Sequence, residues 1–148
     1  MSALDPKTEQ RCRESFARQK MMAAIGAEIL SVKPGECELV MPFDERFAQQ
    51  HGFMHAGVIT TLGDTACGFA SLSLMPEDAA VLTTEFKVNL LSPAKGERFI
   101  AIGKVVRPGK KLMVCLGEVF AEDAGKRKQV ALMTASMMVM DTSTGLKD

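Results

Sequence analysis

Residues 49–70 read QQHGFMHAGVITTLGDTACGFA, and the rest of the chain is organised around this stretch. It begins with a polar, glycine-containing segment that holds the two histidines of the chain, His51 and His55. It continues as an apolar segment with one carboxylate, Asp64, near its middle. Because an unpaired carboxylate is costly to bury, Asp64 is a candidate functional residue. His51 is more simply explained as a loop residue.

Two stripes at the three-to-four residue spacing of a helix run along this stretch. The small stripe comprises Gly57, Thr61, Asp64, Gly68 and Ser71. The apolar stripe comprises Val58, Leu62, Ala66, Phe69 and Leu72. This pattern predicts a buried central helix that packs one face on a sheet. Its small face would let something narrow approach the backbone closely.

The first turn of the predicted helix, at His55, Ala56 and Gly57, presents backbone N–H groups that can bind an anion or an oxyanion. His55 and Asp64 are separated by roughly 900° of helix rotation and about 13 Å along the axis. They therefore face opposite sides and cannot act on one atom within one chain. If both belong to one site, two copies of the chain must build it across a two-fold axis.

Length and composition predict a single domain over residues 1–148, large enough for a proper core. The formal net charge is zero, which gives no indication of a nucleic-acid partner. The 11 methionines are best explained as core residues. Alternatively, they line a pocket for a flexible apolar ligand.

Residues 1–13 contain no apolar segment typical of a signal peptide, and no apolar run is long enough to span a membrane. The four cysteines, Cys12, Cys37, Cys67 and Cys115, are dispersed and form no CxxC motif. They predict reduced, mostly buried thiols in a cytoplasmic protein. The histidines do not pair with cysteines or carboxylates at ligand spacing, so neither a metal site nor a cofactor is expected.

Capping and turn signals predict the remaining elements. Asp5-Pro6 predicts a helix that runs to about Ala24, within an N-terminal helical segment over residues 1–25. Strands are expected over residues 26–33, 36–41, 80–91, 97–106, 112–121 and 127–141, followed by a flexible tail over residues 142–148. In the first strand after the central helix, alternation places Leu82, Thr84, Phe86, Val88 and Leu90 on one face. The order of elements predicts an α+β domain whose mainly antiparallel sheet wraps one buried helix.

Three motifs resemble those of hotdog-fold acyl-CoA thioesterases of the PaaI-like family. Residues 52–57 (GFMHAG) resemble the family's G-x-x-H-G-G motif, and residues 62–64 (LGD) resemble its L-x-D motif. Residues 92–97 (SPAKGE) resemble its S-P-A-K/R-x-G-E turn. The likeness covers roughly residues 26–140. It implies a hotdog fold, in which an antiparallel sheet wraps around a long central helix.

The resemblance also implies a mechanism for thioester hydrolysis. The backbone N–H of Ala56, with Gly57, would form the oxyanion hole, and His55 would help to position the thioester. Asp64 would come from the partner subunit and would either activate water or attack directly. An Asp with an ordinary pKa of about 3.9 is ionised at neutral pH, so no covalent Ser or Cys nucleophile is needed.

Two further site residues follow from the resemblance. Thr83 falls where the family often has a hydroxyl residue that orients the attacking water. Gln49 falls where relatives often carry an Asn that contacts the carboxylate or the water. Ala56 replaces a family glycine, which keeps the backbone donor but reduces the space beside the carbonyl by a methyl group.

The expected substrate is an apolar acyl or aryl thioester of coenzyme A. Phe53 and Met54 are expected to contact its acyl group. A basic loop would either bind the phosphates of coenzyme A or form only a solvated hairpin turn. The binding residues in this loop would be Arg107, Gly109, Lys110 and Lys111. The family resemblance further implies a homodimer that pairs into a tetramer.

Structural alternatives exist for the main site residues. Asp64 could accept hydrogen bonds from Thr60, Thr61 or a neighbouring strand, His55 could cap the helix, and Thr83 could be an ordinary strand residue. Two alternative functions also remain. One is an acyl-CoA binding or sensing module without catalysis, and the other is a hotdog dehydratase or hydratase. Thiol release from a CoA ester would separate hydrolysis from both.

Overall fold

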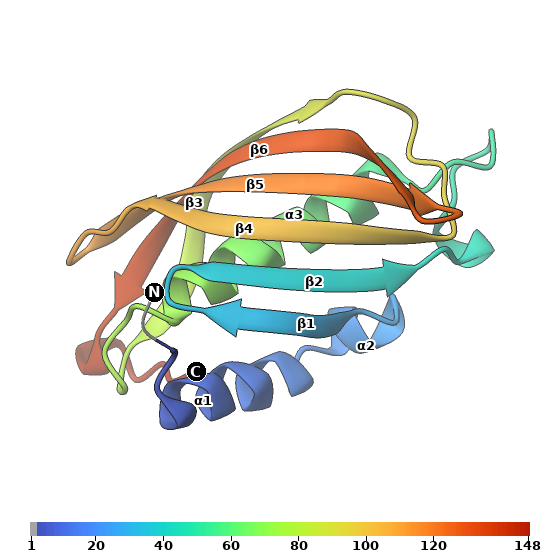
Figure 1. Cartoon of the computed structure of the whole chain (residues 1–148). Coiled ribbons are helices and arrows are strands. Elements are labelled where there is room, and N and C mark those ends of the chain that lie inside the picture. Colours follow the sequence, from blue (N-terminus) through green and yellow to red (C-terminus); the bar gives the residue numbers. More distant parts are fainter. Residues whose placement is uncertain (1–2) are drawn as a thin grey trace.

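The computed structural model describes residues 3–148 as a six-stranded sheet with a long helix against one face (Figure 1). The elements are α1 (Pro6–Ala17), α2 (Lys20–Ala24), β1 (Glu28–Lys33), β2 (Glu36–Pro42), α3 (Ala56–Leu72), β3 (Ala80–Leu90), β4 (Arg98–Arg107), β5 (Leu112–Asp123) and β6 (Lys126–Met140). The strand order is β1-β2-β4-β5-β6-β3, and all neighbouring strands are antiparallel. The predicted α+β architecture is confirmed.

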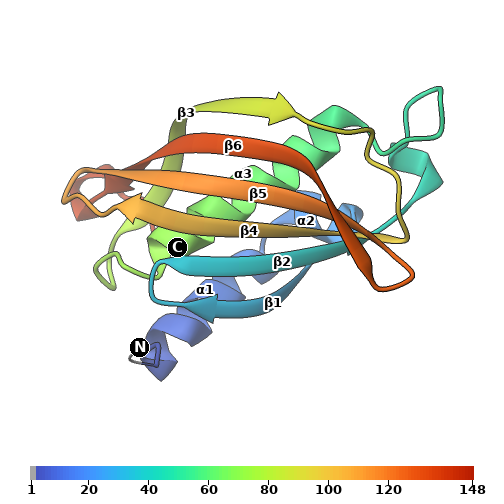
Figure 2. The same ribbon diagram turned by 45° about the horizontal axis from the view of Figure 1, so that its top comes forward.

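The sheet curves around α3, whose apolar stripe packs into the core (Figure 2). Two strand glycines allow the helix to approach the sheet closely. A Cβ atom on Gly103 would lie 2.4 Å from the carbonyl oxygen of Ala66, and one on Gly117 would lie 2.9 Å from Cys67 Sγ. The close approach at the sheet is therefore made through strand glycines on the apolar side of α3. The small stripe of α3 instead leaves open space, since a Cβ on Gly68 would meet no atom within 4 Å.

The N-terminal segment forms two helices, which corrects the expectation of one continuous helix to about Ala24. Asp5 caps α1 as predicted, with its carboxylate accepting a hydrogen bond from Thr8 N–H at 3.1 Å. The chain then becomes extended at Gln19. Cys12 and Met22 are both buried, yet residues ten apart on a straight helix would point about 80° away from each other. The break brings both side chains into the core.

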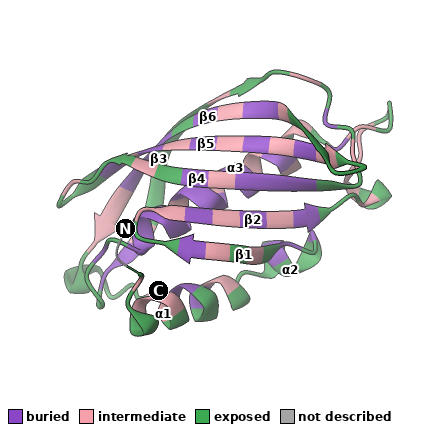
Figure 3. Cartoon of the chain, in the orientation of Figure 1, coloured by how far each residue is buried: buried purple, intermediate pink, exposed green. Residues whose placement is uncertain are grey.

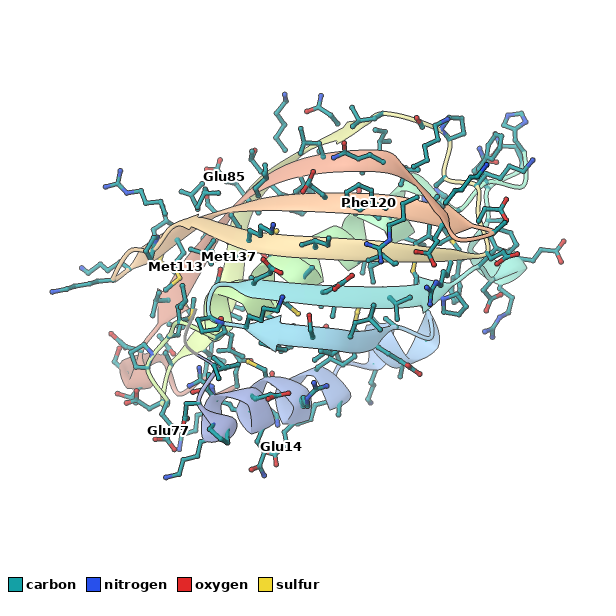
Figure 4. All side chains as sticks on the ribbon, viewed as in Figure 1. Glu14, Glu77, Glu85, Met113, Phe120 and Met137 are labelled. Atoms are coloured by element: carbon teal, nitrogen blue, oxygen red, sulfur yellow. The ribbon has the colours of Figure 1, made fainter. Side chains whose placement is uncertain are left out.

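Hydrogen bonds fasten both α1 and the C-terminal tail to the rest of the domain. The Arg11 guanidinium donates hydrogen bonds to the carbonyl oxygens of Leu72 and Pro76 at 2.7 and 2.6 Å, which fastens α1 to the C-terminal end of α3. Figure 4 shows Glu14 of α1 and Glu77 of the loop that follows α3 at this same end of the molecule. The sequence predicts a flexible tail over residues 142–148. In the structure, the Asp148 carboxylate of this tail accepts a hydrogen bond from Val81 N–H at 2.6 Å.

β3 is an edge strand and is exposed along most of its length (Figure 3). A bulge between Thr83 and Glu85 corrects the expected alternation. Thr83 pairs with buried Met137, so it faces α3, and Leu82 faces the opposite side. Beyond the bulge, Phe86 and Leu90 also face the helix side.

All four cysteines are free and buried, as predicted. Burial raises the pKa of Cys12 to about 11 and that of Cys37 to about 12, so both are neutral thiols at neutral pH. Within residues 3–148, none of the helices has the length and apolar composition needed to cross a bilayer.

Candidate active site

The start of α3 is capped by a histidine side chain. His55 is the N-cap residue, and its Nδ1 accepts a hydrogen bond from Gly57 N–H at 2.8 Å. Because Nδ1 is the acceptor, the ring proton of the neutral imidazole lies on Nε2. His55 therefore fills the capping role that was one of its two predicted alternatives. The N–H of Gly57, one of the two expected oxyanion donors, is therefore hydrogen-bonded to His55 in this structure.

One backbone donor remains free in the first turn of α3. Among residues 3–148, no hydrogen bond uses the N–H of Ala56. The two preceding N–H groups, those of Met54 and His55, are bonded to loop carbonyls at 2.9 and 3.0 Å. A free N–H at this position lies at the positive end of the helix dipole. Of the two predicted oxyanion donors, Ala56 is thus the available one.

A cavity of about 380 Å³ lies beside Ala56. Four of its lining residues are buried, Met54, Ile59, Ala94 and Val130. Leu90 and Leu91 line it with exposed side chains. Of the predicted site residues, the cavity brings together Gln49, Phe53, Met54 and Ala56. Of the other lining residues, Ser92, Pro93 and Ala94 belong to the turn that resembles the family's S-P-A-K/R-x-G-E motif. Ile59, Leu90, Leu91 and Val130 carry only apolar character in the sequence.

Gln49 is held by the loop that precedes α3. Its Oε1 accepts a hydrogen bond from the backbone N–H of His51, and its own backbone N–H donates to Phe53 O at 2.8 Å. The side-chain amide nitrogen makes no hydrogen bond within the described part of the chain, so it is available to a ligand. His51 is exposed in this loop.

Asp64 lies half-buried in the middle of α3 and is contacted from a neighbouring strand. Its Oδ1 accepts a hydrogen bond from Thr83 Oγ1 of β3 at 2.8 Å. The same hydroxyl lies 3.3 Å from Sδ of Met137, which is labelled in Figure 4. Thr60 and Thr61 do not contribute, because their hydroxyls donate to helix carbonyls at 2.8 Å. The strand alternative is therefore the one that the structure shows.

The electrostatic setting of Asp64 favours a proton acceptor. Burial raises the pKa of its carboxyl above the ordinary value, and the hydrogen bond from Thr83 opposes this shift. A carboxylate with a raised pKa is a stronger base while it remains ionised at neutral pH.

The two halves of the predicted site are separate within one chain. Ala56 and Asp64 are about 12 Å apart along the axis of α3. Neither Asp64 nor Thr83 lines the cavity beside Ala56. A single protomer therefore places the free N–H of Ala56 and the carboxylate of Asp64 on different parts of its surface.

The basic loop between β4 and β5 lies at the opposite end of α3 from Ala56 (Figure 1). Gly109 and Lys110 line a second cavity of about 540 Å³ together with Leu74 and Met113. Arg107, the last residue of β4, and Lys111 of the loop are both exposed. Within the described residues, no ion pair involves these cations. They are free to bind an anionic ligand.

No metal centre is apparent in the part of the chain that the structure describes. None of its His, Cys, Asp and Glu side chains form a group of three or more placed to hold an ion.

Solved structures of other proteins have the same overall fold. A thioesterase family protein from Silicibacter pomeroyi is 50% identical in sequence, with a TM-score of 0.89 over 90% of this chain and 98% of that one. The PaaI protein from the phenylacetic acid degradation operon of E. coli has a TM-score of 0.83 at 23% identity, over 92% of this chain and 95% of that one. The hotdog fold is therefore confirmed.

Sequence comparisons point to the same family. A putative esterase from Halobacterium salinarum is 33% identical over 99 residues, which cover 64% of this chain and 65% of that protein's length. The putative esterase ComA2 from Bacillus subtilis is 29% identical over 98 residues, 66% of this chain and 78% of that protein. The model of the thioesterase superfamily matches residues 51–128. The chain therefore belongs to the thioesterase superfamily, a family of thioester hydrolases, and has a PaaI-like hotdog fold.

Proposed function

We propose that this protein is an acyl-CoA thioesterase that hydrolyses the thioester of an apolar acyl or aryl group to a free acid and coenzyme A. One observation carries the proposal: the free N–H of Ala56, at the start of α3, borders an apolar cavity. A thioester oxygen bound there would gain stabilisation from this N–H and from the helix dipole as negative charge develops on it. The apolar walls would hold the acyl group.

The carboxylate would come from a second copy of the chain. A two-fold arrangement of the open faces of α3 would set the partner's Asp64 beside Ala56. As a base, the carboxylate would take a proton from water while the water oxygen attacks the thioester carbon. The carbon–sulfur bond would then break and coenzyme A would leave as its thiolate. As a nucleophile, the carboxylate would attack that carbon itself and expel the thiolate of coenzyme A, and water would then hydrolyse the resulting mixed anhydride to the free acid and the Asp64 carboxylate.

The neighbouring residues would support this step in distinct ways. Thr83 would orient the carboxylate or the water, and Gln49 would contact the water through its free amide nitrogen. His55 would hold the first turn of α3 and present its Nε2–H to the thioester. At the far end of α3, the cations of residues 107–111 would bind the phosphates of coenzyme A.

The exposed edge of the sheet supports a dimer. Phe86 is 48% and Leu90 55% exposed although both face the helix side of the sheet. An apolar strand with one unpaired edge is a ready template for pairing with another chain. We infer a homodimer, joined in pairs as a tetramer. Since the cysteines are reduced, we also infer a cytoplasmic location.

Ala56→Pro tests the oxyanion donor. Ala56 is the first residue of α3, where proline fits a helix, and His55 already has the extended backbone (ψ 136°) that precedes a proline. The substitution removes the N–H donor and puts a ring carbon in its place. Thiol release from acyl-CoAs should fall by about 100-fold or more. Ala56→Gly keeps the donor and should retain activity.

Mixing two inactive variants tests the shared site. In a dimer of one Ala56→Pro and one Asp64→Asn protomer, one site carries both defects and the other carries neither. With random pairing, co-expressed variants should recover about one quarter of wild-type thiol release. If both groups act within one chain, the mixture stays inactive, and the two-chain site is wrong. If the wild type releases no thiol from any acyl-CoA, the enzymatic proposal is wrong.

A binding or sensing module is the second candidate, because Asp64 and His55 both have structural partners within their own chain. Stoichiometric binding of an acyl-CoA without thiol release would favour this function.

A further inference from the structure

The strand pair β5–β6 contains a bulge beside the Ala56 cavity. Val119 pairs with Ala131 and Phe120 pairs with Gln129, which leaves Val130 as the extra residue on β6. Val130 and Ala131 are consecutive, yet each is only 1% exposed. Regular alternation would turn one of them to the outer face of the sheet. The bulge thus turns an additional side chain inward, which is a recurrent role of bulges near active sites.

Contacts on both sides hold this bulge in place. The side chain of Gln129 points to the outer face, where its amide donates a hydrogen bond to Glu118 Oε1 at 3.1 Å. The carbonyl oxygen of Val130 accepts a hydrogen bond from Leu91 N–H at 2.8 Å. Leu91 also lines the cavity, so the same bulge fixes a second part of the cavity wall.

Val130 is a buried part of the cavity wall. It lines the cavity together with Ile59, which is also 1% exposed, whereas Leu90 and Leu91 of the same lining are 55% and 51% exposed. The side chain of Val130 has no polar atom, so an alkyl group bound in this cavity would pack against it. A change in the size of this side chain would change the volume available to the alkyl group.

We propose that Val130, turned inward by the β6 bulge, sets the length of the acyl chain that the cavity accepts. The proposal rests on the apolar thioester ligand of the proposed function. It does not require catalysis. Each methylene that gains or loses burial changes affinity by about fourfold.

The test measures binding of S-alkyl-CoA thioethers from hexyl to dodecyl by calorimetry, since thioethers resist hydrolysis. Val130→Ala removes two methyl groups and should move the tightest-binding chain about one or two carbons longer. Val130→Ile adds one methylene and should move it in the opposite direction. Val119→Ala is the matched control. Val119 is also 1% exposed, but it packs against α3 at Gly63 and does not line the cavity.

The control should bind the thioethers in the wild-type order of affinity. An unchanged length preference in both Val130 variants would overturn the assignment, as would a wild type that binds no thioether. A shift in Val119→Ala equal to that in Val130→Ala would also overturn it. Shifted binding in a protein that releases no thiol would reject the hydrolase and retain the role of Val130.

Discussion

At the scale of single residues, Asp64 has a pKa raised by burial, and within residues 3–148 its carboxylate accepts one hydrogen bond, from the hydroxyl of Thr83. A carboxylate that is partly desolvated costs stability, and at a functional site such a cost accompanies reactivity. A substitution of Asp64 should therefore affect activity and stability in opposite directions.

Asp64→Asn should remove activity and stabilise the fold. The loss of a base or nucleophile should lower kcat by about 100-fold or more, measured as thiol release from acyl-CoAs. Because the folded carboxyl has the raised pKa, the folded state holds its proton more tightly than the unfolded state. Its contribution to stability is present at low pH and is lost as pH rises through the folded pKa. Chemical denaturation at pH 7 should show the variant more stable by up to about 1 kcal/mol. A less stable variant would mean that the ionised carboxylate makes a net favourable contact.

Thr83→Val should move the pH profile of the reaction. The hydrogen bond from Thr83 lowers the pKa of Asp64, so its loss should raise that pKa further. The acid limb of the kcat/KM profile should then shift to higher pH. Thr83→Ser keeps a hydroxyl and should restore the wild-type limb. If the limb stays in place in Thr83→Val, the acid limb does not report Asp64.

At the scale of an element, α3 has two different sides. Its apolar side approaches β4 and β5 through Gly103 and Gly117, and its small side is open at Gly68. The first turn of α3 lies beside the cavity. There the N–H of Gly57 is capped by His55, and the N–H of Ala56 is free. The helix thus serves as the centre of the core and as the frame of the site.

Substitutions of His55 should separate capping from contact with substrate. His55→Ala removes the acceptor of Gly57 N–H and should lower the free energy of unfolding by about 1 kcal/mol. Asn is a good N-cap residue, so His55→Asn should keep wild-type stability in thermal unfolding. If His55 also positions the thioester, both variants should raise KM or lower kcat. Full activity in His55→Asn would restrict the histidine to capping.

At the scale of the whole molecule, one protomer exposes an apolar strand edge next to the open face of α3. Under the proposed function, this surface would also bring Asp64 of one protomer to Ala56 of the other, which a single chain does not do. Assembly would complete the site as well as cover apolar side chains, so activity and oligomeric state should change together.

Phe86→Glu should dissociate the dimer and remove activity. A charge on the exposed apolar side of β3 would be desolvated at the interface, which is strongly unfavourable. Sedimentation should show a smaller species, and thiol release should fall with it. Lys87→Glu changes the neighbouring residue on the outer face and is the matched control. An active dimer of Phe86→Glu would place the interface elsewhere.

The sequence predicts the elements well because their signals are local. The central helix and six strands follow from periodicity, and the turns follow from Pro and Gly pairs. The break at Gln19 and the bulges at Thr83 and Val130 escape this reasoning. They depend on which strands become neighbours and on how the core is filled.

For the candidate site, helix geometry alone indicated that His55 and Asp64 cannot act on one atom within one chain, since the rise and rotation of a helix place them on opposite sides. Only the tertiary structure decided which groups are free. It occupied Gly57 N–H with His55, gave Asp64 a donor from a strand 19 residues away, and turned Val130 into the cavity. Periodicity arises between near neighbours in the chain, whereas satisfaction of a polar group depends on contacts that form only when distant segments pack together.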